Sequence, residues 1–554
     1  MGQREAHLSR ARNGTFDLLI LGGGVTGVGV ARDAARRGLR VALLERADLA
    51  SGTSSRSSKL VHGGLRYLEQ YEFSLVFESV SERRVLMDIA PHLVRPLGFV
   101  FPVFSESGRS AAIIDAGMWL YDGLSLFRSP KLHRRLSRKA CAKEEPALRR
   151  EGLSSAELYY DCATDDARLT LETALDAARA GAVVATWCPA VRLLHDERGR
   201  IFGVEAHDLL GDQRFEVRAR AIVNATGPWS DALRAEALGG RARPLLRPTK
   251  GVHVVVDRAS LPVQHAVVLT HPGDGRVLFA IPWGERTYVG TTDTDWAGDP
   301  AEVAADRADV DYLLAAAAHF FPDHGLTPAD VIATWAGLRP LIGQAGVGES
   351  QVSREHHVEI EPDGMITIAG GKLTTYRRMA AEVVDRAVDV LRLSGMALDP
   401  LRAPGTERDP LPGAVGWPRD DDEDQLVSGI LRASGGRLSE PSARYLAESH
   451  GMLGLDVAVL IASRPELAAP LVPGRPEPLG CVDWAVTREL AATLDDVLQR
   501  RTPLFFKDLD QGLGCAEKVA DHMAGLLGWS PKRRDAEVGR YRAEVARSRA
   551  WREG

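Results

Sequence analysis

Residues 16–45 read FDLLILGGGVTGVGVARDAARRGLRVALLE, and this stretch decides the fold of the first part of the chain. It holds an apolar strand at 16–21, glycines at G-x-G-x-x-G spacing, a helix-patterned segment and a second apolar strand at 39–44. Glu45 follows that strand directly. A strand, a glycine turn, a helix, a strand and an acid in this order are typical of a unit that binds a dinucleotide. The pattern does not separate FAD from NAD.

Each glycine of the motif has its own physical task in such a unit. Gly22 allows the tight turn, Gly24 lets the backbone approach a pyrophosphate, and Gly27 lets the helix pack on the strand. The helix N-terminus offers unpaired N–H groups and the positive end of the helix dipole to that pyrophosphate. Glu45 can accept hydrogen bonds from a ribose.

The composition is that of an ordinary globular protein of several structural units. The chain has 554 residues, of which 45% are hydrophobic and 26% charged, and its net charge is −6. This charge gives no reason to expect a nucleic-acid partner. The five cysteines are scattered and form no C-x-x-C pair. We therefore expect a reducing compartment, no disulfide framework and no metal site. The polar residues 1–14 predict no secretory signal, and the lack of a long apolar run predicts no transmembrane helix.

The remaining chain alternates strand-rich and helix-rich segments. Residues 76–150 are predicted to be mostly helical, and strands recur at about 183–227, 244–294 and 354–369. A proline-rich stretch at 395–425 ends in an acidic run and reads as a linker before an almost wholly helical tail. The first nucleotide-binding unit is thus interrupted. Dehydrogenases that use NAD usually keep this unit contiguous, so the interruption favours a flavoprotein.

Several segments resemble FAD-dependent glycerol-3-phosphate dehydrogenases, both bacterial aerobic and mitochondrial. The resemblance runs in order from about residue 15 to residue 395 and is weaker in the helical tail. It is carried by TSSRSSKLVHGGLRYLE (53–69), NATGPWSD (224–231), KGVHVVV (250–256), IPWGERTYVGTTD (281–293), WAGLRPL (335–341) and GGKLTTYRRMA (370–380).

The resemblance implies an α/β chain with a glutathione-reductase-like FAD-binding fold, an inserted, mainly antiparallel substrate domain and a C-terminal helical domain. The expected boundaries are a discontinuous FAD-binding domain at 14–75, 150–230 and 340–395, a substrate or cap domain at 76–149 and 231–339, and a helical domain at 400–554. The implied reaction oxidises sn-glycerol 3-phosphate to dihydroxyacetone phosphate, with electrons passing to a membrane quinone. The implied location is peripheral, on the cytoplasmic face of the inner (plasma) membrane, and a homodimer is left open.

A phosphomonoester substrate needs several cationic donors, and the matched motifs supply them. Arg66, Arg339 and Lys372 each stand in a glycine-rich or turn context, and Arg354 is a fourth candidate from a weaker motif. Arginine offers phosphate a planar fork and lysine a point charge. The expected substrate-binding residues are Arg66, Tyr67, Arg339, Arg354, Lys372 and Thr374. For Tyr67, a core aromatic beside two leucines is an equal alternative.

The expected FAD-binding residues come from the first motif, the serine-rich loop and two later glycine turns. They are Gly22, Gly24, Val25, Thr26, Gly27, Glu45, Thr53, Ser54, Ser55, Ser58, Lys59, His62, Gly63, Gly64, Thr226, Gly227, Gly370, Gly371 and Lys372.

Alcohol oxidation by hydride transfer needs a group that takes the hydroxyl proton. His253, in KGVHVVV, is the candidate general base, because a neutral imidazole accepts a proton near pH 7. A structural, hydrogen-bonded histidine is an equal alternative, and His62 is a weaker candidate base. The expected catalytic set is His253, Arg339 and Lys372, the two cations stabilising a developing alkoxide.

Residues 111–139 combine an apolar segment, AAIIDAGMWLYDGLSLF, with the basic run RSPKLHRRLSRK. This combination suits contact with an anionic lipid surface, and a core helix followed by a solvated basic loop is the alternative. Three other functions stay open. They are a glycerol-3-phosphate oxidase that uses oxygen, a flavin-dependent amine or amino-acid oxidase of the same fold, and a flavin-binding regulator without turnover.

Overall fold

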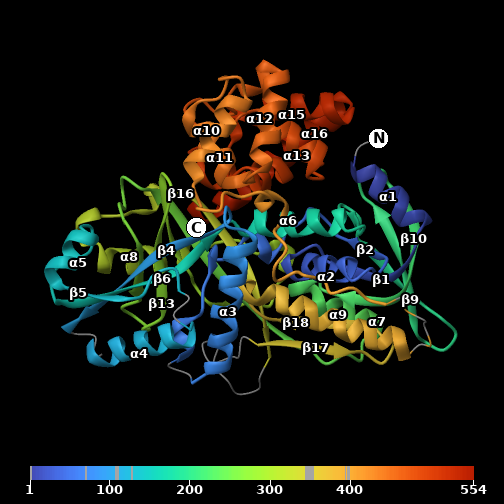
Figure 1. The fold of residues 1–554 in the computed structure, drawn as a ribbon, viewed down its shortest axis with the longest axis horizontal. Helices are drawn as coiled ribbons and strands as arrows, with labels where there is room; N and C mark the ends of the chain where they lie inside the picture. The colour runs from blue at the N-terminus through green and yellow to red at the C-terminus, as the bar shows by residue number, and fades with distance from the viewer. Residues whose placement is uncertain are drawn as a thin grey trace.

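The structure is a computed structural model in three parts, two of them built on β-sheets and one made of helices (Figure 1). It describes residues 3–553 except 69–70, 106–110, 127–128, 344–354, 394, 396–397 and 399, and it gives only the backbone of 66, 67 and 111. Within these residues, no helix has the length and apolar character needed to cross a lipid bilayer. The helical part lies above the junction of the two sheets in Figure 1, as the sequence predicts for a separate C-terminal domain.

The first sheet contains the predicted nucleotide-binding unit. Its strand order is β17-β18-β10-β1-β2-β7, with β8 and β9 continuing from β10. β1 pairs in parallel with both β10 and β2. β1 is apolar and almost wholly buried, as expected for a central parallel strand. The strands are β1 (Thr15–Leu21), β2 (Val41–Leu44), β7 (Val183–Ala185), β8 (Ala190–His195), β9 (Ile201–Asp208), β10 (Gln213–Asn224), β17 (His356–Ile360) and β18 (Ile366–Gly370).

Helices cover this sheet on one face. α2 (Val25–Arg36) packs against both α6 (Asp166–Arg179) and α9 (Tyr376–Leu393), and the three share one buried cluster with the sheet. The other face carries β8, β9 and α1 (Gln3–Asn13). The sequence analysis does not predict the helix α1.

The second sheet is mainly antiparallel and has the order β15-β11-β14-β13-β12-β4-β6-β3, with β16 beside β11 and β5 beside β6. Its strands are β3 (Leu60–Val61), β4 (Val94–Phe104), β5 (Arg134–Ser137), β6 (Leu153–Thr164), β11 (Leu246–Asp257), β12 (Ala266–Thr270), β13 (Val277–Trp283), β14 (Arg286–Gly290), β15 (Thr294–Asp295) and β16 (Val331–Ile342). Its helices are α3 (Phe73–Ile89), α4 (Ala111–Leu124), α5 (Arg138–Glu144) and α8 (Arg307–Phe320), and α7 (Ser230–Ala237) lies beside β18 of the first sheet.

Two strands of the second sheet differ from the sequence expectation. β4 is an eleven-residue strand inside 76–150, a segment expected to be mostly helical. β6 pairs with β4 along almost all of its length, so it belongs to the second sheet although the expected FAD-binding domain included 150–230. Both differences have one cause. Each strand forms by pairing with a strand far along the chain, and local sequence patterns do not show such pairing.

The C-terminal part is helical, as expected. Its helices are α10 (Glu423–Ala433), α11 (Glu440–His450), α12 (Leu453–Ser463), α13 (Gly480–Arg488), α14 (Leu504–Lys507), α15 (Leu513–Leu527) and α16 (Pro531–Arg549). α13 ends at Arg488, and a separate π-helical segment follows at Asp496–Arg501. Ser530 caps α16 by accepting the N–H of Arg533 at 3.2 Å, and Pro531 takes the first helical position, a Ser-Pro pair that is typical of a helix start.

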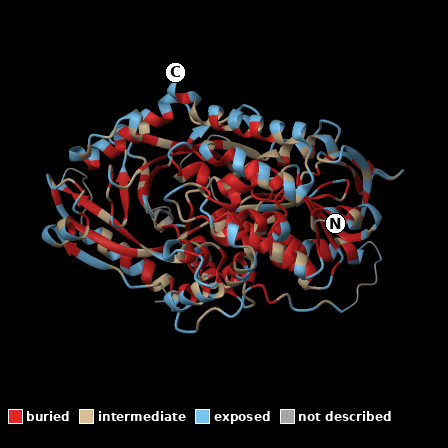
Figure 2. Cartoon of the chain, turned by 90° about the horizontal axis from the view of Figure 1, so that it is seen from above, coloured by how far each residue is buried: buried red, intermediate tan, exposed pale blue. Residues whose placement is uncertain are grey.

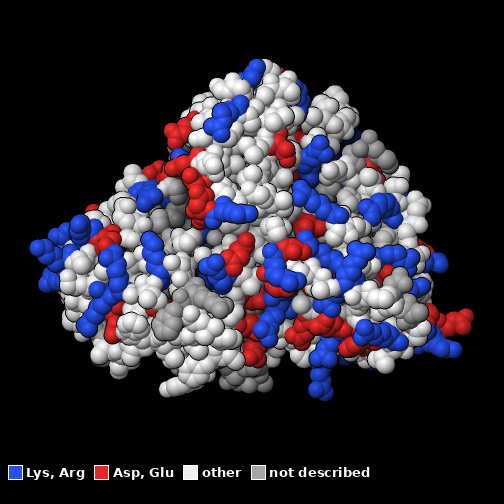
Figure 3. All heavy atoms as spheres, in the orientation of Figure 1, with Lys and Arg blue, Asp and Glu red and all other residues white. Residues whose placement is uncertain are grey.

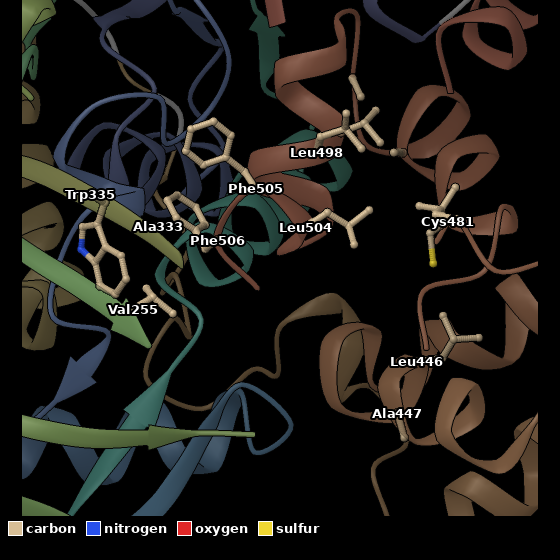
Figure 4. Close-up of a cluster of buried hydrophobic side chains, with 14 of the residues drawn as sticks. Val255, Ala333, Trp335, Leu446, Ala447, Cys481, Leu498, Leu504, Phe505 and Phe506 are labelled. Atoms are coloured by element: carbon tan, nitrogen blue, oxygen red, sulfur yellow. The ribbon is translucent and has the colours of Figure 1, made fainter. Parts of the chain in front are cut away.

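One hydrophobic core joins the helical part to the second sheet. It contains Trp335 and Val255 of the sheet together with Phe505 and Phe506 of the helical part, drawn as neighbours in Figure 4. Seen from above, buried residues fill the middle of the molecule, while exposed residues line its outer margin (Figure 2). The helical part is therefore not an appendage on a flexible linker, because its core is continuous with that of the sheet.

Candidate functional site

A cleft of about 600 Å³ opens at the carboxyl ends of the parallel strands of the first sheet. This edge is where open α/β sheets bind their ligands. Among the residues that line the cleft, those expected to bind FAD are Gly22, Gly24, Val25, Thr26, Glu45, Thr53, Ser54, Thr226, Gly227, Gly370, Gly371 and Lys372.

The motif glycines lie where side chains would not fit. Gly22 has a φ of +111°, and a Cβ there would lie 2.5 Å from the carbonyl oxygen of Ala225. A Cβ on Gly27 would collide with the carbonyl of Gly22, so Gly27 serves the packing of α2 and does not line the cleft. Gly24 faces the cleft, and a Cβ there would meet Ser54 Oγ at 3.2 Å.

Glu45 is buried at the end of β2 and lines the cleft. Its carboxylate accepts the N–H of Gly23 at 2.6 Å and the N–H of Ala47 at 2.8 Å. Burial raises the pKa of this carboxyl above its ordinary value. The two backbone donors fix the orientation of the carboxylate at the place where the sequence predicts a ribose.

The cleft has the donors that a dinucleotide needs. Ser54 Oγ accepts the N–H of Val25, at the start of α2, at 2.9 Å. Backbone N–H groups at a helix N-terminus are the donors that bind a pyrophosphate. Trp229 lines the cleft with Arg46 5.1 Å above its ring. The buried Nε1 of Trp229 makes no hydrogen bond within the described part of the chain. These groups fit FAD, whose phosphates and ring edges are acceptors.

A smaller cavity of about 180 Å³ lies between the first cleft and the second sheet. The two spaces are contiguous, since Thr53, Ser57, Pro340, Gly371, Lys372 and Leu373 line both. The smaller cavity is also lined by the predicted residues Ser58, His62, His253, Arg339 and Thr374. The sequence motifs of the proposed substrate site therefore meet in one space beside the dinucleotide cleft.

Arg339, on β16, enters this cavity with a fixed guanidinium. Its Nη1 donates to Asp293 Oδ1 at 3.0 Å, and its Nη2 donates to Thr291 Oγ1 at 3.0 Å and to the carbonyl of Thr292 at 3.1 Å. A Cβ on Gly251 would lie 2.6 Å from Nη2, so the neighbouring strand β11 leaves room for the group only because it has glycine there.

Lys372 follows the two positive-φ glycines at the end of β18 and lines both spaces. Its Nζ lies 3.4 Å from Ser79 Oγ of α3. Thr374 binds the backbone of His62, accepting its N–H and donating to its carbonyl at 3.2 Å in each case. Thr374 thus ties the loop after β3 to the start of α9.

His253, on β11, is buried and packed flat against Trp335, with 4.6 Å between the ring centroids. Its Nε2 is 2.9 Å from Ser58 Oγ, and its Nδ1 makes no hydrogen bond to any residue that the structure describes. Burial lowers the pKa of His253 well below its ordinary value, and Arg339 and Lys59 lower it further. The ring is therefore neutral at pH 7 and has one nitrogen available for a proton.

Comparison with known proteins agrees with this geometry. Residues 17–419 match the family described as FAD dependent oxidoreductase, and residues 404–534 match the C-terminal domain of alpha-glycerophosphate oxidase. The chain is 41% identical to a glycerol-3-phosphate dehydrogenase of Mycobacterium leprae over 98% of this chain and 90% of that protein. The chain belongs to the FAD-dependent glycerol-3-phosphate dehydrogenase family.

Two further relatives extend this result. The crystal structure of the glycerol-3-phosphate dehydrogenase from Bacillus halodurans complexed with FAD has a TM-score of 0.80 and 31% identity, covering 99% of this chain and 98% of that one. An alpha-glycerophosphate oxidase of Streptococcus pneumoniae is 35% identical over 98% of this chain and 96% of that protein. The expected fold class and the FAD cofactor are thereby confirmed, and the chain is an FAD-dependent oxidoreductase.

Some residues expected in the cofactor set lie outside both cavities. Lys59 is buried and binds Asp166 Oδ1 at 2.6 Å and the carbonyl of the equally buried Ser55 at 3.1 Å, so its charge stabilises the loop. The N–H of Gly63 donates to Tyr121 and Asp161 in the second sheet's domain. Gly64 follows with a φ of +78°. The four residues shape the loop between the cavities and do not line them.

Three expected substrate residues cannot be placed. Arg354 and the side chains of Arg66 and Tyr67 lie outside the described part of the chain. Other residues line the smaller cavity without having been expected there, among them Arg56, Ser57 and Thr291. Arg56 stands inside the serine-rich loop 53–59, and its place in that motif is a sequence signal for a residue near the site. Thr291 had no signal of its own, because its place depends on the pairing of β11 with β14.

Proposed function

We propose that this protein oxidises sn-glycerol 3-phosphate to dihydroxyacetone phosphate and passes the electrons to a membrane quinone. The observation that carries the proposal is the small cationic cavity that shares its wall with the FAD cleft. It brings Arg339 and Lys372 around a space that suits a short phosphorylated alcohol. The relatives named above, which act on this compound according to their names, support the same substrate.

The cations bind the phosphate and orient the alcohol. Arg339 holds a fixed fork because Asp293 and Thr291 restrain its guanidinium. Arg56 also lines this cavity, but the charges that act on its guanidinium are Glu544, Arg547, Arg500 and Asp495 of the helical part, so we assign the phosphate to Arg339 and Lys372. Lys372 lines both spaces, and in this proposal its ammonium group contacts the substrate oxygen nearest the flavin. Such preorganised charges stabilise an alkoxide as it develops.

His253 takes the hydroxyl proton in this proposal. Its neutral ring is positioned by Ser58 on one side and by the face of Trp335 on the other. FAD, when bound, supplies the hydride acceptor. Removal of the proton by the imidazole raises the electron density on the oxygen, which drives the carbon–hydrogen bond to break.

An anaerobic titration tests the substrate. Adding glycerol 3-phosphate to the FAD-loaded protein should bleach the long-wavelength flavin band, whereas glycerol and glycine should leave it unchanged. No bleaching by glycerol 3-phosphate would refute the proposal and favour a flavin-binding regulator. Bleaching by glycine alone would favour an amino-acid oxidase.

The electron acceptor requires its own experiment, because the relatives include an oxidase. Reduced enzyme mixed with a short-chain quinone should be reoxidised much faster than enzyme mixed with air-saturated buffer. Rapid peroxide formation without quinone turnover would instead favour an oxidase like the alpha-glycerophosphate oxidase of Streptococcus pneumoniae.

A docking surface for lipid supports the membrane part of the proposal. Large apolar side chains are exposed on neighbouring elements, since α3 packs against α4. They are Tyr71, Phe73, Phe77, Ile113, Trp119, Leu120, Leu126 and Leu132. The lower margin of the molecule below α4 and α3 has a broad uncharged area, with Lys and Arg to its left (Figures 1 and 3). Apolar side chains beside cations suit an anionic lipid surface.

The predicted basic run is exposed beside this surface, but part of its charge is compensated. Arg134 binds Glu144 at 2.6 Å, whereas Arg138 and Lys139 are exposed at the start of α5. The segment 111–139 is also partly a core helix, because Met118 and Tyr121 of α4 are buried. We propose a peripheral position on the cytoplasmic face of the inner (plasma) membrane, and a homodimer stays a prediction.

Sedimentation with liposomes tests the surface. The double variant Ile113→Ser with Phe77→Ser should bind vesicles of anionic and neutral lipid several-fold more weakly than the unchanged protein. The matched control is Val459→Ser with Leu509→Ser, which replaces two equally exposed apolar residues of the helical part. Equal binding by the first variant and the unchanged protein would refute this docking surface.

A further inference from the structure

Three metal-ligating side chains meet in the second sheet's domain, away from both cavities. They are Asp115 of α4, His133 just before β5, and Glu157 of β6. One ligand atom from each lies within 4.8 Å of the other two. The sequence predicts no metal site, because these residues form no short spacing motif. The pairing of β5 with β6 and the packing of α4 against β6 bring them together.

Glu157 is the residue that most needs a cation. Its side chain is fully buried, and neither carboxylate oxygen accepts a hydrogen bond from the described residues. Arg135 Nε lies 3.9 Å from Oε1, beyond hydrogen-bonding distance, on a side chain that is half exposed. A buried carboxylate without close donors is costly, so its two free oxygens indicate a bound ion.

His133 is oriented as a ligand. Its Nδ1 is 2.8 Å from Asp122 Oδ2, which also accepts the backbone N–H of His133 at 3.1 Å. Because Asp122 accepts in this contact, Nδ1 is the donor, and Nε2 is the ring nitrogen that can bind an ion. Nε2 lies 3.7 Å from Asp115 Oδ1. A carboxylate that holds the second ring nitrogen is the usual support of a metal-bound histidine.

We propose that Asp115, His133 and Glu157 bind a divalent transition-metal ion of the Zn²⁺ type. One imidazole nitrogen and two carboxylate oxygens suit Zn²⁺, with water as a fourth ligand on the side of the partly exposed Asp115. Mg²⁺ and Ca²⁺ prefer a shell made of oxygen atoms, so the histidine disfavours them. The ion joins α4 to β6, and its role is structural because its ligands line neither cavity.

A zinc titration of the FAD-loaded protein tests the site. The protein is stripped with a chelator and titrated with ZnCl₂ against a zinc-binding dye. We expect one ion per chain at this site, and we expect Glu157→Gln and Asp115→Asn each to weaken zinc binding about 10- to 100-fold or more. The matched control is His207→Gln, which removes a histidine 2.9 Å from Asp212 at the surface and should leave zinc binding unchanged.

Thermal unfolding gives a second readout that does not depend on activity. Zinc should raise the Tm of the unchanged protein but not that of Glu157→Gln. In the chelator, Glu157→Gln should be at least as stable as the unchanged protein, because the variant no longer buries an uncompensated carboxylate. The proposal is overturned if both ligand variants bind zinc as tightly as the unchanged protein, or if the unchanged protein takes up no zinc.

Discussion

At the scale of single residues, Arg339 is the strongest candidate for the phosphate contact. We predict that Arg339→Ala raises KM for glycerol 3-phosphate by roughly 30-fold or more, since losing a partner of a buried charge pair costs about 2–5 kcal/mol. FAD should stay bound, because Arg339 lines only the smaller cavity. Steady-state kinetics together with the flavin content of the purified variant would check both statements.

Arg276 provides the control for this substitution. It also binds Asp293, at 2.9 Å, but it does not line the cavity. Arg276→Ala should therefore raise KM far less than Arg339→Ala does. If the two variants have the same KM, the effect comes from releasing Asp293 and not from a lost phosphate contact.

His253 leads to a prediction about pH. Because burial, Arg339 and Lys59 lower its pKa, the imidazole stays neutral as the pH falls from 8 to 6. We predict that kcat shows no titration near the ordinary histidine pKa of about 6.5 and falls only at more acid pH. His253→Gln should lower kcat by about 100- to 10,000-fold with little change in KM.

A pH–rate profile would decide between the base and a structural histidine. A structural role predicts that His253→Gln loses stability while keeping a kcat close to that of the unchanged protein. Ser58→Ala offers an intermediate case, because it removes the 2.9 Å contact with Nε2 but leaves the imidazole in place.

At the scale of elements, the loop after β2 is held by the helical part. Asp48 is fully buried and binds Arg500 Nε at 2.6 Å and Arg501 at 2.7 and 2.8 Å. We predict that Asp48→Ala lowers the free energy of unfolding by about 3–5 kcal/mol, because the buried guanidinium groups of Arg500 and Arg501 each lose a carboxylate partner, although Arg500 keeps Asp496. It should also weaken FAD binding, since Glu45 stands in the same loop.

The effect of Asp48→Ala depends on pH in a defined direction. Burial alone would raise the pKa of Asp48, but Arg501 and Arg500 outweigh it and hold the pKa below its ordinary value. The stabilisation is therefore complete above the ordinary aspartate pKa of about 4 and is lost as the pH falls through the lowered pKa. Urea unfolding at several pH values should show the difference between variant and unchanged protein shrinking in acid.

Elements whose signals are local could be predicted from the sequence. The unit β1-α2-β2 follows from glycine spacing and apolar strands, and α16 follows from its Ser-Pro cap. β4 could not be predicted in the same way. Its sequence, VRPLGFVFPVF, includes two prolines and a glycine, and its strand form depends on β6 and β12.

The site residues also divide into those that the sequence places correctly and those whose position depends on distant partners. Glu45 and Arg339 could be assigned to the cavities because they stand in recognisable motifs. Lys59 stands in such a motif too. It forms an ion pair with Asp166, a residue far along the chain, and it does not line the cleft. Spacing within a motif places a residue near a site, but it does not show which charged partner the fold brings to that residue.

At the scale of the whole molecule, the helical part packs behind His253, the proposed general base. Phe506 of α14 packs against Trp335 with 5.6 Å between ring centroids, and Trp335 stacks on His253 at 4.6 Å. Figure 4 shows Phe506 directed toward Trp335 from the helical part. The helical part therefore reaches the proposed active site through two aromatic contacts, and we propose that it helps to position His253 although its helices bear no predicted catalytic residue.

We predict that Phe506→Ala lowers both stability and kcat. The cavity should cost about 3–5 kcal/mol, and the loosened Trp335 should allow His253 to leave its position. Phe505→Ala is the matched control, because Phe505 packs against Phe506 and Tyr541 inside the same core. It should cost similar stability, measured by urea unfolding, while kcat falls much less. An equal loss of kcat in both variants would mean that the helical part supports the fold alone and does not position His253.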